Sequence, residues 1–281
     1  MKERTITSAV ILVITLLLVI FSGYIVYPIV LSFLAIIAIY EILKVMQVQK
    51  KWILSVPAYI FAVAFPIAAF FVSGESVLPF ILTVAAAMFV YMLYLMGVSV
   101  FSKGSIPFSK ISEVFITVTY VTVSFTSLSL IRYINRPVGA YQVVLVFGVA
   151  WMCDVFAFLV GSAIGRHKLI PEISPKKTVE GAIGGVVSAV IGFLLYGLGL
   201  ELIVNGMQVN YLFLGLCGLV LSVVSQLGDL VASLIKREYG VKDYGKIFPG
   251  HGGVMDRFDS VLSVSTILLI LCIAFPPFAM G

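Results

Sequence analysis

The segment 225–260 carries the residues most able to do chemistry, because it combines carboxylates, basic side chains and glycines within 36 positions. Asp229 closes an apolar run, and Asp256 and Asp259 follow the glycine turn at Gly252 and Gly253. Mg²⁺ is held in proteins by one or two carboxylates together with phosphate oxygens, while Lys and Arg neutralise the remaining charge. The pattern therefore predicts a metal–phosphate site. A network of surface ion pairs would not need the glycine turn.

The connector 164–180, IGRHKLIPEISPKKTVE, is a second polar segment. Pro171 and Pro175 exclude helix and favour extended or turn backbone. Thr178 is a predicted N-cap for the helix that follows, with Glu180 in its first turn. Basic side chains crowd this helix start, which suits phosphate. They are Arg166, His167, Lys168, Lys176 and Lys177.

Asp154 stands within an apolar run, flanked by Cys153 and Val155. A carboxylate at the centre of a membrane helix costs about 2.5–3.5 kcal/mol on insertion scales, so such an acid indicates function by default. The alternative is an interhelical hydrogen bond worth about 1 kcal/mol.

The elements that must position these residues follow from composition. The chain has 281 residues, of which 61% are hydrophobic and 11% charged, whereas a soluble domain carries about 25% charged residues. One soluble core could not hide so much apolar surface, so a bilayer must be the solvent. We expect an all-α polytopic integral membrane protein with about nine transmembrane helices. The predicted spans are 6–23, 27–43, 53–72, 77–99, 113–131, 141–163, 179–200, 209–231 and 261–280.

Charge distribution predicts the orientation. With a cytoplasmic N-terminus, sixteen of the 18 basic residues fall in cytoplasmic segments, and only Arg132 and Arg136 lie outside; this asymmetry follows the positive-inside rule. Residues 1–135 are predicted to form scaffold helices 1–5, in which Glu41 and Glu113 have structural roles at helix ends near lysines. Residues 136–281 are predicted to form helices 6–9, with the catalytic connectors 164–180 and 232–260.

These motifs resemble the signature of the phosphatidate cytidylyltransferases, or CDP-diacylglycerol synthases, over roughly residues 140–275. Ser-x-Leu-Gly-Asp ending at Asp229 and the element Ser174 to Thr178 match that family, as does the acid on the sixth span. The central match comprises Ser233-Leu234-Ile235-Lys236-Arg237, Lys242-Asp243, Gly245, Pro249, His251-Gly252-Gly253, Asp256-Arg257 and Asp259.

The resemblance implies transfer of the cytidylyl group from CTP to phosphatidic acid, giving CDP-diacylglycerol and pyrophosphate. By analogy, Asp229 and Asp256 would hold Mg²⁺, with Asp154 and Asp259 as second candidates and room for a second cation. The implied catalytic residues are Asp229, Asp256, Lys236, Arg237, Lys242, His251 and Arg257. The implied substrate-binding residues are Ser174, Lys176, Lys177, Thr178, Gly252 and Gly253.

The expected location is the cytoplasmic, or inner, membrane, with the site facing the cytoplasm. Membrane lipid and the two substrates are the expected partners; no nucleic acid is expected, and the glycine-lined helices are compatible with a homodimer.

Two rival functions remain open. One is a related CTP-using membrane enzyme acting on another lipid, such as an archaeal ether lipid or a polyprenol. The other is a transporter, which should show inverted repeats or interrupted spans; no paired halves are visible in the sequence.

Overall fold

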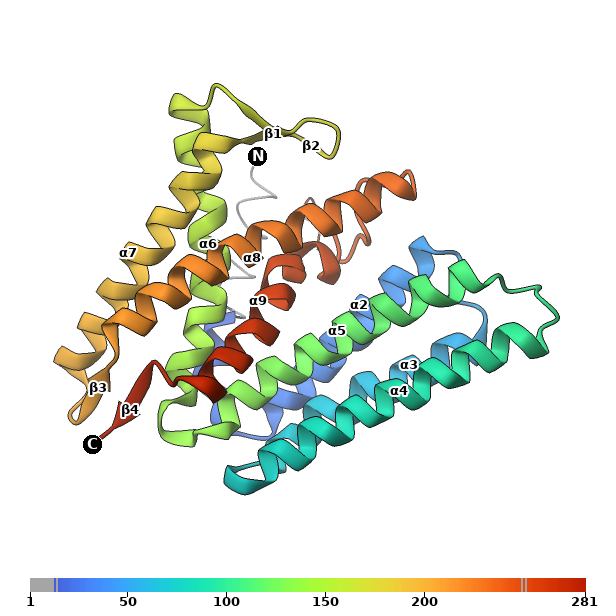
Figure 1. Ribbon diagram of the computed structural model, residues 1–281, viewed down its shortest axis with the longest axis horizontal. Coiled ribbons are helices and arrows are strands. Elements are labelled where there is room, and N and C mark those ends of the chain that lie inside the picture. Colours follow the sequence, from blue (N-terminus) through green and yellow to red (C-terminus); the bar gives the residue numbers. More distant parts are fainter. Residues whose placement is uncertain (1–12, 14, 249, 251) are drawn as a thin grey trace. The chain divides into compact units, whose positions relative to one another are not determined.

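The computed structural model describes residue 13, residues 15–248, residue 250 and residues 252–281. The chain forms two compact units (Figure 1). Unit 1 comprises Met1–Asn135 and Asp243–Arg257, and unit 2 comprises Arg136–Lys242 and Phe258–Gly281.

Within the described residues, eight helices are long and apolar enough to cross a membrane. They confirm a polytopic helical fold. Their bounds are α2 Val26–Val45, α3 Trp52–Ala68, α4 Val77–Phe101, α5 Phe108–Ile134, α6 Arg136–Ile164, α7 Val179–Ile203, α8 Tyr211–Glu238 and α9 Val254–Ala274. Short 3₁₀ helices occupy Phe21–Gly23, Ala69–Phe71 and Gly74–Ser76.

Eight of the predicted spans correspond to these helices. Of the predicted first span, 6–23, the structure describes residues 13 and 15–23, which are helical up to residue 20 and end in the 3₁₀ helix Phe21–Gly23. The last helix differs most from its predicted bounds of 261–280, because it begins at Val254 and ends at Ala274. Pro276 and Pro277 cannot continue a helix, and strand β4 (Phe278–Met280) follows them. The earlier start places Asp256 in the first turn of α9.

In unit 1, α2, α3 and α5 pack against one another and α4 packs on α5 (Figure 1). Leu31, Ala35 and Ala38 of α2 are fully buried in this bundle. Hydroxyl groups satisfy backbone carbonyls between helices: Ser129 Oγ of α5 donates to the Pro66 carbonyl near the end of α3 at 2.8 Å. The last carbonyls of a helix have no partner within it, so this bond joins the end of α3 to α5.

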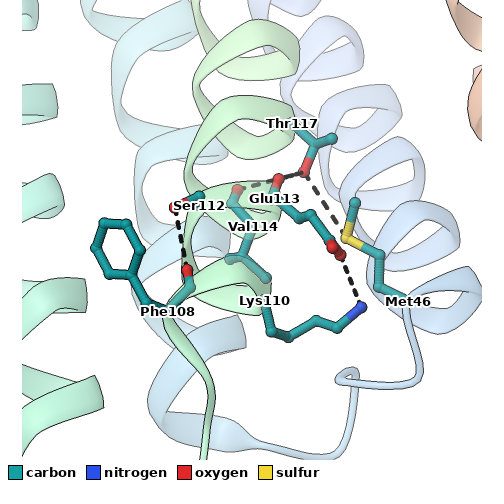
Figure 2. Close-up of polar contacts among 7 residues, drawn as sticks. All are labelled: Met46, Phe108, Lys110, Ser112, Glu113, Val114 and Thr117. Carbon is teal, nitrogen blue, oxygen red and sulfur yellow. Dashed lines mark hydrogen bonds and ion pairs between the residues drawn. The ribbon is translucent and has the colours of Figure 1, made fainter.

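Figure 2 shows the polar contacts at the start of α5, where Lys110 pairs with Glu113 at 2.7 Å. Thr117 Oγ1 donates to the Glu113 carbonyl at 2.7 Å and faces the Met46 sulfur at the end of α2. Glu113 is therefore neutralised by a neighbour one turn away, which agrees with the structural role expected for it.

In unit 2, α7 packs against both α6 and α8. Strands β1 (Lys168–Ile170) and β2 (Ser174–Thr178) form an antiparallel hairpin before α7, and β3 (Met207–Val209) pairs with β4 after it (Figure 1). These two ribbons were not predicted as strands. The first agrees with the extended backbone expected around Pro171 and Pro175.

Candidate active site

The predicted site residues divide between the two units. Unit 1 holds Gly252, Gly253, Asp256 and Arg257. Unit 2 holds Asp154, Ser174, Lys176, Lys177, Thr178, Asp229, Lys236, Arg237, Lys242 and Asp259. His251 lies outside the described residues.

The central contact of unit 2 is an ion pair between Lys177 Nζ on β2 and Asp229 Oδ2 on α8. The two side chains are 26% and 25% exposed. A solvent-accessible pair adds about 1 kcal/mol or less to stability, so its main effect is to place opposite charges at the boundary between the hairpin and the helix. Both residues were predicted for the site, and the hairpin brings them together although they are far apart in sequence.

A cavity of about 140 Å³ lies beside this pair. Its polar lining consists of Asp154, Lys176, Lys177, Thr178 and Gln226. The Gln226 amide donates to the Ala182 carbonyl of α7 at 3.2 Å, which fixes the orientation of that side chain. Gln226 was not among the predicted site residues. Its position three residues before Asp229 on α8 puts the two on neighbouring positions of one helix face, and this spacing could have indicated it.

Thr178 caps α7, as predicted, because its Oγ1 accepts the Gly181 N–H at 3.1 Å. The threonine is buried where α6 meets α7. A Cβ on Gly161 or Gly165 would come within 2.7 Å of its Oγ1, and one on Gly181 within 2.9 Å. These glycines therefore serve close packing inside unit 2, and they give no support to the predicted homodimer.

The hairpin is closed at its base by His167 and Glu180. His167 Nδ1 lies 2.6 Å from Glu180 Oε1, and the His167 N–H donates to the same carboxylate at 3.2 Å. The Val179 N–H donates to the His167 carbonyl at 2.9 Å. Glu180, which was predicted only as a first-turn acid, thus holds the segment that carries Lys176 and Lys177.

We expect Glu180→Gln to weaken this closure, because the neutral amide loses charge-assisted bonds to His167. The expected result is a rise of about two- to fivefold in the KM for a phosphate-bearing substrate with a smaller change in kcat, because solvent screens this exposed pair and its loss has a modest effect. Steady-state kinetics measure it, with Glu201→Gln at the other end of α7 as the control. An unchanged KM would contradict the role assigned to Glu180.

A second carboxylate of unit 2 comes from α9. Asp259 is 9% exposed and its Oδ1 accepts the Ser260 N–H at 2.7 Å. It interacts electrostatically with Asp229, Asp154 and Lys236. Helix α9 approaches α8 closely here, because Gly228 has no side chain and Ser263 Oγ donates to the Val224 carbonyl at 3.2 Å.

The donor types fit magnesium, which prefers carboxylate oxygens and completes its shell with phosphate and water. Among the residues that the structure describes, no group of three or more His, Cys, Asp or Glu side chains stands close enough to hold a metal by itself. Carboxylates that interact electrostatically with one another suit an ion whose coordination shell is completed by oxygens of a bound phosphate.

Helix α8 continues past Asp229 to Glu238, beyond the predicted end of the span at 231, and carries Lys236 and Arg237 in its last turn. It ends in a glycine cap: Gly240 has φ +65°, and the Val241 N–H donates to the Lys236 carbonyl at 2.9 Å. Glycine adopts this left-handed conformation without steric cost. The exposed Lys242 follows directly.

In unit 1, the glycine turn is held by Asp256. Its Oδ2 accepts the N–H groups of Tyr244 at 2.8 Å and of Gly253 at 2.9 Å. Asp256 is 6% exposed, whereas the neighbouring Arg257 is exposed. Gly252 has φ +83°, and a Cβ there would also meet the Asp256 carboxylate.

Glu41 binds the backbone next to this turn and was not among the predicted site residues. It lies on α2 and is 3% exposed, with its carboxylate bonded to the N–H groups of Val254 and Met255. Its place near lysines at a helix end suggested only a structural role, because spacing along the chain says nothing about a partner 213 residues away.

The fold and site thus define an integral membrane protein with multiple spans, whose polar residues suit the binding of phosphates and a divalent cation. The model of the cytidylyltransferase family matches residues 2–275. The chain belongs to that family.

Curated relatives cover nearly the whole chain. The phosphatidate cytidylyltransferase of Staphylococcus aureus (strain COL) is 35% identical over 274 residues, which are 97% of this chain and 99% of the relative. That of Staphylococcus epidermidis is 36% identical over 275 residues, with the same coverage. That of Staphylococcus haemolyticus is 34% identical over 274 residues, again 97% of this chain and 99% of the relative. The signature predicted from the sequence lies inside these matched regions.

Proposed function

We propose that this chain is a phosphatidate cytidylyltransferase, which converts CTP and phosphatidic acid into CDP-diacylglycerol and pyrophosphate in phospholipid biosynthesis. The observation that supports it best is the full-length similarity to relatives of that name. The charge arrangement around Lys177 and Asp229 fits a reaction between two phosphate-bearing anions.

In this reaction a phosphate oxygen of the lipid attacks the α-phosphorus of CTP. A new P–O bond forms, and the bond from the α-phosphorus to the bridging oxygen breaks, so pyrophosphate leaves with the electron pair. The attacking oxygen is already ionised at neutral pH and needs no strong base. The barrier is mainly electrostatic repulsion, so cations positioned around the phosphates supply most of the catalysis.

The cations of the site are assigned to this task. Lys176 and Lys177 line the cavity beside Thr178 and would hold phosphate oxygens, together with Ser174 on the same strand. Lys236, Arg237, Lys242 and Arg257 would neutralise further phosphate charge, and backbone at Gly252 and Gly253 would approach the substrate. His251 would donate a hydrogen bond.

Mg²⁺ is the proposed cofactor, with Asp229 and Asp256 as the predicted ligands and Asp154 and Asp259 as second candidates. Within unit 2, Asp229, Asp259 and Asp154 supply carboxylates of the type that fits this ion. When bound, the ion would polarise phosphate oxygens and offset the charge that develops in the transition state. A second cation is compatible with this number of acids.

We also propose that the site faces the cytoplasm from the inner membrane. The support is the charge asymmetry of the sequence. The connectors 164–180 and 232–260 are rich in Lys and Arg, whereas Arg132 and Arg136 flank the connection between α5 and α6. CTP would arrive from the cytoplasm and phosphatidic acid from the adjacent leaflet. A homodimer stays a prediction.

The test is a reconstituted assay in vesicles or detergent that follows pyrophosphate release from CTP. We expect release only when CTP, phosphatidic acid and Mg²⁺ are all present, with CDP-diacylglycerol formed in equal amount, and no release after chelation by EDTA. Absence of lipid-dependent release would overturn the proposal. Release with a polyprenol or an archaeal ether-lipid acceptor, and not with phosphatidic acid, would establish the rival lipid enzyme instead.

A further inference from the structure

Glu41 caps the start of α9 from a helix at the other end of the sequence. Its Oε1 accepts the Val254 N–H at 3.1 Å, and its Oε2 accepts the Met255 N–H at 2.9 Å. The first N–H groups of a helix have no partner within it, and a negative charge is favoured there. At 3% exposure, the carboxylate replaces solvent as the acceptor for both groups.

Two glycines make room for this carboxylate. A Cβ built on Gly245 or on Gly253 would stand 2.1 Å from Glu41 Oε1. Neither glycine has the left-handed backbone that by itself requires glycine, in contrast to Gly252 at φ +83°. The absence of a side chain at these two positions is therefore explained by the approach of Glu41.

Glu41 and Asp256 together bind the backbone at the two ends of the glycine turn, at Tyr244 and at Gly253–Met255. Asp256 accepts the N–H groups of Tyr244 and Gly253, and Glu41 accepts those of the next two residues, Val254 and Met255. A bond from the Phe248 N–H to the Gly252 carbonyl at 2.9 Å closes the turn between them. Four backbone N–H groups, of Tyr244 and of Gly253–Met255, are thus bound by two buried carboxylates, one from the next residue of α9 and one from α2.

We propose that Glu41 is a positioning residue for the reaction, which holds the turn and the start of α9 so that Asp256 and Arg257 are presented in one geometry. This inference rests on the proposed function. Glu41 itself is buried under the turn and acts through these two residues. A misplacement of about 1 Å in a catalytic group can lower the rate by about 10²-fold, so a tether of this kind has a measurable effect on kcat.

The test compares Glu41→Gln with the wild type. Glutamine keeps the shape of the side chain and one acceptor oxygen, but its NH₂ group faces one of the two N–H donors and cannot accept from it. We expect kcat per folded molecule to fall about 10- to 100-fold. Trypsin should cleave after the exposed Lys242 and Lys246 at least about tenfold faster, because cleavage follows the population of the opened segment.

Three internal references accompany this measurement. Cleavage in the other connector, after Arg166 or Lys168, should keep its rate, and the thermal midpoint should change little. Glu113→Gln is the matched variant, because it removes a carboxylate of the same unit that pairs with Lys110 of its own helix. Its kcat should equal that of the wild type.

Gly253→Ala gives a reciprocal test. Alone it should lower kcat, because its Cβ collides with the Glu41 carboxylate. In a Glu41→Ala background the same change should add little further loss, so the two effects are coupled. Gly199→Ala, where a Cβ meets nothing within 4 Å, is the matched control.

An unchanged kcat and unchanged cleavage after Lys242 and Lys246 in Glu41→Gln would overturn the inference. A fall in activity explained wholly by a smaller folded fraction, with normal kcat per folded molecule, would also overturn it and leave only a structural cap. Faster cleavage in Glu41→Gln, combined with a wild type that does not turn over CTP, would refute the proposed function while supporting the tether.

Discussion

Replacing Asp229 by asparagine is expected to lower the initial rate of CDP-diacylglycerol formation by about 10²-fold or more, the size of effect seen when one preorganised charge-stabilising group is removed. The amide keeps the shape of the side chain but loses the charge that attracts a divalent cation and pairs with Lys177. Because a pair about one quarter exposed contributes about 1 kcal/mol or less to stability, the variant should fold normally. The measurement is the rate at saturating CTP, phosphatidic acid and Mg²⁺, with the thermal midpoint recorded in the same detergent.

The control for Asp229 is Glu172→Gln, which removes an exposed acid from the turn between β1 and β2 and should leave the rate unchanged.

The double variant Lys177→Met/Asp229→Asn separates two roles of the pair. If the two side chains only neutralise each other, the double variant should regain activity. We expect it to remain inactive, because each residue also acts on substrate or metal. Full activity in Asp229→Asn would remove that residue from the site.

Asp256→Asn is the second large expected effect, again about 10²-fold or more in rate. Its structural consequence should be small. The asparagine oxygen can still accept the N–H groups of Tyr244 and Gly253 that now bond to one carboxylate oxygen, Oδ2. The charge is lost while the turn is kept, so tryptic cleavage after Lys242 and Lys246 should stay at the wild-type rate.

Asp256→Ala provides the contrast. It leaves those two N–H groups without their acceptor, at a cost of roughly 1–3 kcal/mol for each that stays buried, so activity and protection of the turn should be lost together. Glu238→Gln, which changes an exposed acid at the end of α8, is the control. If Asp256→Asn were active and Asp256→Ala inactive, Asp256 would be a structural residue of the turn, and the predicted metal ligand would have to be another acid.

Much of this protein follows from local sequence patterns. Spans of apolar residues identify the membrane helices, because a helix in a bilayer satisfies its backbone internally and needs only length and hydrophobicity. The caps are equally local: Thr178 at the start of α7 was predicted, and Gly240 at the end of α8 uses the same kind of short-range chemistry. Strands β1 and β2 were anticipated only as extended backbone, since prolines exclude helix without specifying a partner strand.

The two ends of the last helix show where local patterns fail. Hydropathy placed its start at 261, because the first turns of α9 hold Asp256, Arg257 and Asp259 and lower the average. In the structure the helix begins at Val254. Asp256 accepts the N–H of the preceding residue, Gly253, and Glu41 accepts the first two N–H groups of the helix. The boundary was therefore decided by a side chain that the local sequence does not contain.

The sequence by itself determined the class of protein, the residue types of the site and the family signature, since all three depend on composition and short spacings. Only the tertiary structure decided which of those residues meet. It paired Lys177 with Asp229, placed Gln226 beside them, and showed that Glu41 occupies the space left by Gly245 and Gly253. These contacts join segments 44 to more than 200 residues apart, and their partners are set by the packing of helices and not by any pattern along the chain.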